Sequence, residues 1–133
     1  MTGKMNRKIK FRGFVLETED SVLRPNVWVY GDLLHNQKGL PGETIYKYCI
    51  WSGLLYYVDP ESVGEFTGMQ DSEEKDIYEG DVLEGLFDQR KYEVVFDCGC
   101  FSLKIKDRML RFSIIDFSVL KIIGNIYQNP ELI

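Results

Sequence analysis

Residues 92–105 read YEVVFDCGCFSLKI, and this stretch indicates the fold most clearly. Two runs rich in β-branched and aromatic residues, 92–96 and 100–105, flank the turn Asp97-Cys98-Gly99. Gly99 can take the positive φ that hairpin loops need, because it carries no Cβ atom. The stretch therefore predicts an antiparallel β-hairpin.

Outward from this hairpin, the chain continues as short apolar runs separated by turn residues. A second hairpin is expected between residues 44–51 and 54–58, with a two-residue turn at Ser52-Gly53. No long segment repeats with the 3.6-residue period of a helix. We therefore expect a mainly β protein with little helix, whose antiparallel sheets form a partly open barrel. Other predicted elements are a strand over 8–17 bent at Gly13, strands at 27–30, 63–68, 77–83 and 119–123, a helical turn at 32–35, and a helix or strand within 107–117.

The length of 133 residues suits one domain. A chain of this mass can bury roughly 68% of the surface of its unfolded state, so it can form a hydrophobic core without disulfide bonds. Asp59-Pro60 is the clearest break in the pattern, because the residue before a proline is driven into an extended conformation. We expect a single domain over 1–133, with possible subdomains at 1–60 and 61–133.

The charge is acidic overall and uneven along the chain. Sixteen Lys and Arg against twenty-one Asp and Glu give a net charge of -5, which repels phosphate backbones over most of the surface. The first sixteen residues are basic instead, and they either contact an anionic partner or only aid solubility; we favour solubility. The cations of this basic end are Lys4, Arg7, Lys8, Lys10 and Arg12.

Cysteine and histidine offer little for catalysis or metal binding. The chain has three cysteines, an odd number, and it is long enough to fold without disulfide bonds. Its sequence also shows no signal peptide and no apolar run long enough to span a bilayer. We therefore expect a cytoplasmic protein that is not bound to the membrane. A tetrahedral zinc site needs four ligands, and Cys98 and Cys100 would have to be joined by Cys49 and His35 to supply them. This spacing does not match a known zinc-binding motif, so we interpret Cys98 and Cys100 as small apolar residues. His35 is the only histidine, and no nucleophile or phosphate-binding motif is present. We predict no catalytic residue, no cofactor and no metal site.

A run of acids lies between residues 71 and 81. Paired carboxylates can support metal-dependent hydrolysis, but such runs are usually solvated loops. The acids are Asp71, Glu73, Glu74, Asp76, Glu79 and Asp81.

Aromatic residues make up 14% of the chain, and ten of the eighteen fall between Phe11 and Phe66. They could form the core, a protein interface or a platform for stacking bases. We favour an interface over a base platform, because an interface does not require positive charge, and we expect it in the first half of the chain. The candidates are Trp28, Tyr30, Tyr46, Tyr48, Trp51, Tyr56 and Tyr57.

Six segments of the chain are similar in sequence to segments of one protein family and occur in the same order. They are IKFRG at 9–13, YGDL at 30–33, VDPESVGEFTG at 58–68, IYEGDV at 77–82, VFDCGCF at 95–101 and IGNIYQNPEL at 123–132. The chain resembles the YopX family of phage and prophage proteins. The resemblance implies a mainly β fold, with an SH3-like barrel in the 61–133 region. The family has no assigned biochemical activity, so no catalytic residue is carried over. We interpret the glycines of these segments, at 13, 31, 64, 68, 80, 99 and 124, as supplying backbone freedom at strand ends and turns.

Together these observations predict a non-catalytic protein of phage or prophage type. It would act by self-association, as a homo-oligomer, or by binding host or phage proteins. A nucleic-acid-binding accessory protein, using the basic end and exposed aromatic residues, is the first alternative. A metal-dependent hydrolase built on the acids of 71–81 is the second.

Overall fold

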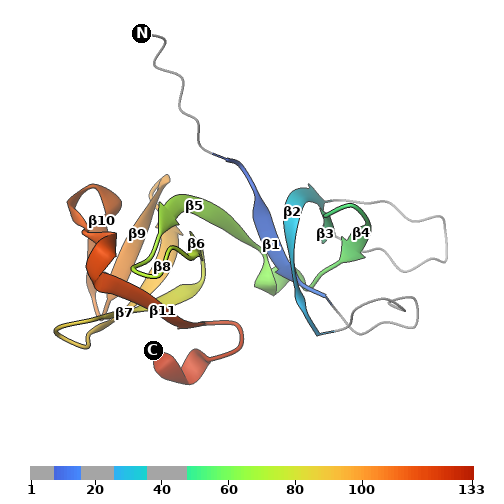
Figure 1. Cartoon of the computed structure of the whole chain (residues 1–133). Helices are drawn as coiled ribbons and strands as arrows, with labels where there is room; N and C mark the ends of the chain where they lie inside the picture. The colour runs from blue at the N-terminus through green and yellow to red at the C-terminus, as the bar shows by residue number, and fades with distance from the viewer. Residues whose placement is uncertain (1–7, 16–25, 36–47) are drawn as a thin grey trace, which may run out of the picture.

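The computed structural model describes residues 8–15, 26–35 and 48–133, and these residues are mainly β-strand (Figure 1). The helices among them are short 3-10 turns. The strands are β1 Phe11–Phe14, β2 Trp28–His35, β3 Tyr48–Trp51, β4 Leu55–Tyr57, β5 Gly64–Gln70, β6 Asp76–Tyr78, β7 Asp81–Gly85, β8 Lys91–Asp97, β9 Cys100–Ile105, β10 Arg108–Arg111 and β11 Leu120–Asn125. The turns are η1 Pro60–Ser62, η2 Phe112–Ile114, η3 Phe117–Val119 and η4 Pro130–Leu132.

The strands form two antiparallel sheets. One has six strands in the order β4-β3-β2-β1-β5-β6, and the other has five in the order β10-β9-β8-β7-β11. The expected mainly β fold with antiparallel sheets is therefore confirmed. Neither sheet closes into a barrel within the part of the chain that the structure describes. The SH3-like barrel stays a prediction.

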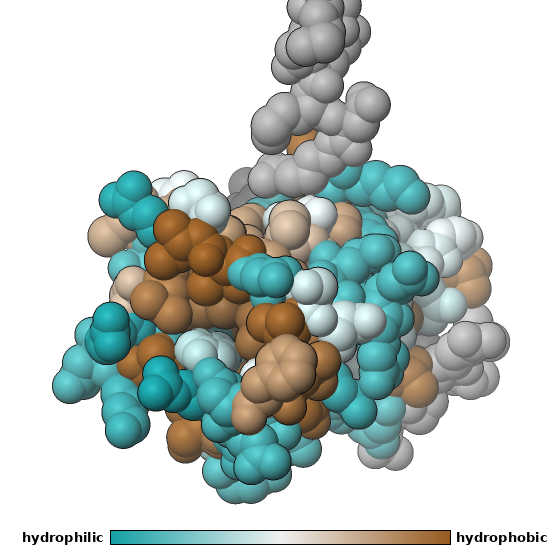
Figure 2. Space-filling view, turned by 60° about the vertical axis from the view of Figure 1, so that its left-hand side comes forward, coloured by the Kyte–Doolittle hydropathy of each residue, from teal (hydrophilic) through white to brown (hydrophobic). Residues whose placement is uncertain are grey.

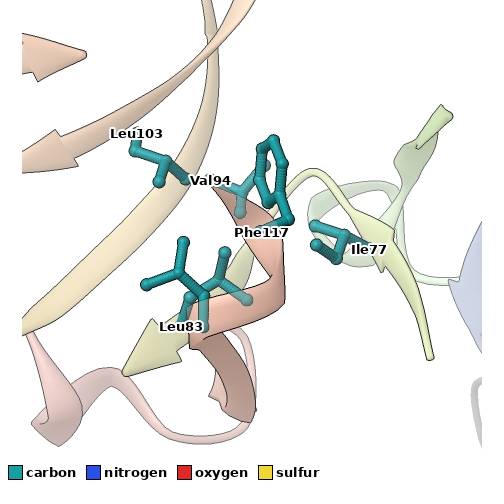
Figure 3. Close-up of a cluster of buried hydrophobic side chains, with 6 residues drawn as sticks. Ile77, Leu83, Val94, Leu103 and Phe117 are labelled. Atoms are coloured by element: carbon teal, nitrogen blue, oxygen red, sulfur yellow. The ribbon is translucent and has the colours of Figure 1, made fainter. Parts of the chain in front are cut away.

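Each sheet covers its own cluster of buried side chains. The six-stranded sheet packs Val15, Val29, Ile50 and Val58 together. The five-stranded sheet covers a second cluster, in which Phe117 comes down from η3 onto the sheet residues (Figure 3). Ile77 of this second cluster lies on β6, so the six-stranded sheet contributes to both cores. In Figure 1, β5 accordingly runs between the two lobes. The division at residue 60 stays a prediction.

The predicted hairpin at 92–105 is present as β8 and β9. Asp97 pairs with Cys100, which leaves Cys98 and Gly99 as a two-residue turn with φ angles of 49° and 79°. Positive φ at both positions matches the twist of the flanking strands.

The second hairpin differs slightly from its prediction. Trp51 pairs with Leu55, so the turn between β3 and β4 holds three residues and includes Leu54. Gly53 takes a φ of 78°, which a three-residue loop of this kind needs. Residues 44–47 of the predicted first strand lie outside the described residues.

Two other local features differ from what the sequence suggested. The β1–β2 register runs without a break from Phe11 to Phe14, so no β-bulge interrupts the strand at Gly13. Residues 32–35 are not a helical turn, since β2 continues through them to pair with β3. The register shift falls instead in β11, between Ile122 and Gly124.

Two of the glycines in the family-like segments serve a different purpose from the one expected. A Cβ atom at Gly31 would overlap the backbone oxygen of Trp51, and one at Gly64 would overlap the backbone oxygen of Glu79. Neither glycine has a positive φ. These positions need a small residue because another strand or turn passes close by.

Candidate functional site

The basic end of the chain contributes to the fold through Lys10 and Arg12. The Arg12 guanidinium lies 2.8 Å from the Asp81 carboxylate, and only 7% of the residue is exposed. It also stacks on Trp28 and Tyr78, with 4.5 and 5.1 Å from its central carbon to the two ring centroids. The charge of Arg12 is therefore already paired inside the molecule.

Lys10, the second of these cations, also forms an ion pair within the protein. The Lys10 ammonium lies 2.6 Å from an Asp76 carboxylate oxygen and 4.6 Å from the centroid of the Phe66 ring. The hydrogen bond that Lys10 donates to Asp76 raises the pKa of Lys10, although partial burial opposes this rise. Lys8 is exposed, while Lys4 and Arg7 lie outside the described residues.

Asp81 is held on two sides inside the protein. Besides the Arg12 ion pair, it accepts a hydrogen bond of 2.8 Å from the backbone N–H of Tyr78. Burial raises the pKa of Asp81, and the nearby guanidinium acts in the opposite direction. This carboxylate links β6 and β7 to β1.

Asp71 is also a structural carboxylate. It is buried, and its oxygens accept hydrogen bonds of 2.9 Å from the backbone N–H groups of Glu73, Lys75 and Ile122. The bond to Ile122 ties the loop after β5 to β11. A carboxylate that already accepts three backbone hydrogen bonds has little capacity left for a metal ion.

The remaining acids of the 71–81 run do not gather around a common point. Glu73 pairs with Lys75 and Lys121 at 3.4 and 3.3 Å, and Glu74 is exposed. Glu79 is half-buried, and burial raises its pKa. Across the described ranges 8–15, 26–35 and 48–133, no three His, Cys, Asp or Glu residues are grouped so that they could hold a metal ion. The hydrolase hypothesis therefore gains no geometric support.

The cysteines lie in different parts of the molecule. Cys49 is buried on β3, whereas Cys98 and Cys100 are exposed at the β8–β9 turn. The Cys98 thiol contacts the Asp97 carboxylate at 3.5 Å, and this hydrogen bond raises the pKa of the thiol. A raised pKa keeps the sulfur protonated and weakens it as a nucleophile or ligand. His35 ends β2, opposite Tyr48.

Most of the candidate aromatic residues are used for packing. Trp28 packs edge-on against Phe14 and Tyr127, and its indole N–H donates to the Gln128 side chain at 2.9 Å. Tyr48 and Tyr56 pack against the core of the six-stranded sheet. The others divide as follows: Tyr57 is half-buried, Tyr30 and Trp51 are exposed, and Tyr46 lies outside the described residues.

A different exposed apolar surface lies on the five-stranded sheet. Phe87, in the turn between β7 and β8, is 85% exposed, and Ile114 of η2 is 72% exposed. With the exposed Leu86, they border a pocket of about 200 Å³ whose walls include Tyr92, Leu110 and Leu120. We call Leu86, Phe87 and Ile114, with this pocket, the Phe87 surface. Figure 2 shows hydrophobic side chains gathered on the face of this lobe that is turned forward.

The turn that carries Phe87 is well fixed by backbone hydrogen bonds. The N–H of Leu86 donates to Val119 at 2.9 Å, and the N–H of Gln89 donates to Gly85 at 3.1 Å. The Asp88 carboxylate accepts from the N–H of Arg90 at 3.0 Å. Phe87 is therefore held outward by an ordered turn. Sequence reasoning missed this surface, although two large apolar residues inside the turn segment Gly85-Leu86-Phe87-Asp88 were a usable signal.

The architecture defines a mainly β protein built from two open antiparallel sheets. The chain belongs to the YopX family, since the family described as YopX protein matches residues 10–133. Among solved structures, it is similar to the one titled crystal structure of protein EF1440 from Enterococcus faecalis, with 23% sequence identity and a TM-score of 0.49 over 94% of this chain and 97% of that chain. The search of curated proteins found no match. In the residues that the structure describes, no helix is long and apolar enough to cross a membrane.

Proposed function

We propose that this YopX family member is a non-catalytic, cytoplasmic binding module of phage or prophage type that associates with a second copy of itself through the Phe87 surface. The observation that carries the proposal is the 85% exposure of Phe87 on an ordered turn. Fully burying one Phe or Ile side chain contributes about 1.5–3 kcal/mol, so an uncovered pair is a strong driving force for association.

The shape of the surface supports a second copy as the partner. A two-fold dimer uses the same patch on both subunits, so the patch must be complementary to itself. Phe87 projects beside a pocket of about 200 Å³ on the same surface, which provides a projection and a hollow next to each other. Two copies facing one another would each place a ring over the hollow of the other.

The molar mass in solution tests this proposal. Light scattering on a size-exclusion column should give a mass near twice 15.5 kDa at high protein concentration. Phe87→Ser should shift the mass to that of the monomer. Phe96→Ser is the matched control, because Phe96 is an exposed phenylalanine at the far end of β8, outside the Phe87 surface. It should leave the dimer intact.

A strict monomer at the highest soluble concentration would overturn self-association. A dimer that Phe87→Ser and Phe96→Ser weaken equally would overturn the choice of surface. The aromatic interface expected in the first half of the chain stays a prediction, and Trp51→Ser in the same assay would test it.

A further inference from the structure

Five cationic side chains surround a groove of about 840 Å³ on the five-stranded sheet. They come from the start of β8, the end of β9, the start of β10, and the turns that precede β8 and follow β9, and all five are exposed. Glu93 is the one acidic side chain in the lining. We call this feature the basic groove, and its cations are Arg90, Lys91, Lys104, Lys106 and Arg108.

These cations differ from the paired cations elsewhere in the molecule. Lys10, Arg12, Lys75 and Lys121 all form ion pairs. Among the groove cations, Arg90 alone forms one, a 4.0 Å contact with Asp88, and the other four have none within the described part of the chain. Glu93 lies opposite Lys104 in the strand register without forming an ion pair. Four unneutralised like charges repel one another, and a bound polyanion would relieve that repulsion.

The turn between β9 and β10 holds one of these cations in an unusual backbone conformation. Lys106 has a φ of 53°, in the left-handed region that glycine, asparagine and aspartate adopt more easily. A glycine at this position would fit the turn at least as well. The lysine therefore adds a charge to the groove at a cost in backbone strain, which points to a use for that charge.

We infer that the basic groove binds the phosphate backbone of a nucleic acid. Protein interfaces are depleted in lysine and enriched in aromatic residues at their centres. The basic groove is lined by three lysines and no aromatic residue, the opposite of that preference, while its two arginines suit either kind of partner. Side chains on one face of a strand repeat about every 6.8 Å, and neighbouring strands lie about 4.8 Å apart, so the cations form a two-dimensional array suited to a line of phosphates.

The residues that line the basic groove also indicate how it would contact a nucleic acid. Without aromatic side chains in the lining, bases have no stacking platform, so the contacts go to the backbone and are independent of sequence. This site also differs from the one expected from the sequence, because Lys10 and Arg12 of the basic end are held in ion pairs. The Phe87 surface takes no part in it.

Fluorescence anisotropy with a labelled DNA duplex and a labelled single strand, over a series of salt concentrations, tests the inference. We expect binding that weakens steeply with salt, with a log–log slope of about -0.9 per neutralised phosphate for the duplex and about -0.7 for the single strand. The double variant Lys104→Gln, Lys106→Gly removes two groove charges and leaves the turn unstrained. It should lower the magnitude of the duplex slope by about 1.8 and weaken binding at least about tenfold at low salt.

The matched control is Lys75→Gln, Lys121→Gln, which removes the same number of charges from exposed cations already paired with Glu73. It should change the affinity by less than about twofold, because these lysines lie outside the groove and the Glu73 carboxylate between them offsets one of their two charges. Equal losses in the two double variants, or no salt-dependent binding by the wild type, would overturn the inference. A change of molar mass in the groove variant with unchanged nucleic-acid binding would also overturn it, and would identify the acidic surface of a second copy as the occupant. Phe87→Ser should leave nucleic-acid binding intact, so this result stands apart from the dimer test.

Discussion

Arg12 on β1 and Asp81 on β7 form a buried ion pair that joins the two sheets. Their side chains are 9% and 3% exposed, and the contacting nitrogen and oxygen are 2.8 Å apart. β1 belongs to the six-stranded sheet and β7 to the five-stranded sheet. The pair therefore fixes the position of one sheet on the other, and Trp28 and Tyr78 shield it from water by stacking on the guanidinium.

Removing the cation of this pair should destabilise the protein severely. Arg12→Met leaves the Asp81 carboxylate buried without a counter-charge, which costs about 3–5 kcal/mol in comparable sites. Urea unfolding followed by tryptophan fluorescence measures the loss. Lys75→Met, which breaks an exposed ion pair with Glu73, is the control and should cost no more than about 1 kcal/mol. Equal costs would show that the pair does not hold the sheets together.

Asp71 should act as a structural residue rather than a metal ligand. Asp71→Asn places an amide NH2 where the carboxylate accepts backbone N–H groups, and should cost about 2–3 kcal/mol in urea unfolding. Glu74→Gly is the control from the same acidic run. Glu74 has a φ of 62°, so glycine should be neutral or stabilising by up to about 1 kcal/mol.

The same acids give a prediction for metal binding. Magnesium, manganese or calcium should not raise the melting temperature, because Asp71 accepts three backbone N–H groups, Asp81 is held by a backbone N–H and the Arg12 guanidinium, and Glu73 and Asp76 are paired with lysines. A metal-dependent rise that disappears in Asp71→Asn would instead support the hydrolase hypothesis.

Gly31 should tolerate no larger side chain. Gly31→Ala forces a methyl group against the Trp51 carbonyl oxygen, and we expect a loss of about 2–3 kcal/mol together with weaker hydrogen-exchange protection of the β3 amides. Gly53→Ala is the comparison, since no atom lies within 4 Å of its would-be Cβ and only its φ of 78° is unfavourable. That variant should cost about 1 kcal/mol and leave the protection of β3 unchanged.

The contact between Tyr127 and Asp59 predicts a pH dependence at the alkaline end. The Tyr127 hydroxyl donates to the Asp59 carboxylate at 2.7 Å; burial, together with this bond, raises the pKa of Tyr127 from 10.0 to about 12. The folded state thus retains a proton that the unfolded chain loses near pH 10. The stabilisation is present in full below pH 10 and is lost as the pH rises towards 12.

Tyr127→Phe should therefore cost about 1–2 kcal/mol at pH 7, and the difference from the wild type should shrink between pH 10 and 12. Urea unfolding at several pH values measures this change. Absorbance titration of the two proteins should differ by one tyrosine that ionises near pH 12. A gap in stability that stays constant across this range would rule out the proposed linkage.

Features that depend on neighbouring residues could be predicted from the sequence. The hairpin of β8 and β9 is an example, since strand-forming residues and the Cys98-Gly99 turn lie within one short stretch. The continuation of β2 through residues 32–35 was missed because its cause is pairing with β3, across a segment of the chain that carries no strong strand signal. Local patterns thus located most strands, while pairing partners decided their lengths.

Contacts between residues that are distant in the sequence could not be predicted in the same way. The alternation of apolar and basic residues does not say which face of β1 is buried, so Arg12 was expected to face solvent. In the structure, Asp81 and Trp28 lie beside it. The basic groove was missed for a similar reason, because its cations come from two separate segments, 90–91 and 104–108. The predicted hairpin already placed Lys91 and Lys104 on adjacent strands, and counting charges on that hairpin would have found the groove.

The pairing of β1 has a consequence for how the chain folds during synthesis. β1 is made before the residues that it needs, because it pairs with β5, its Arg12 pairs with Asp81, and Trp28 of the neighbouring β2 donates to a glutamine 100 residues further on. Folding dominated by such non-local contacts is slow, and unpaired strands are prone to aggregate in the meantime. In the nascent chain the β5-facing edge of β1 therefore stays unpaired until residues 64–65 have been made, and Arg12 lacks its carboxylate until residue 81 has been made.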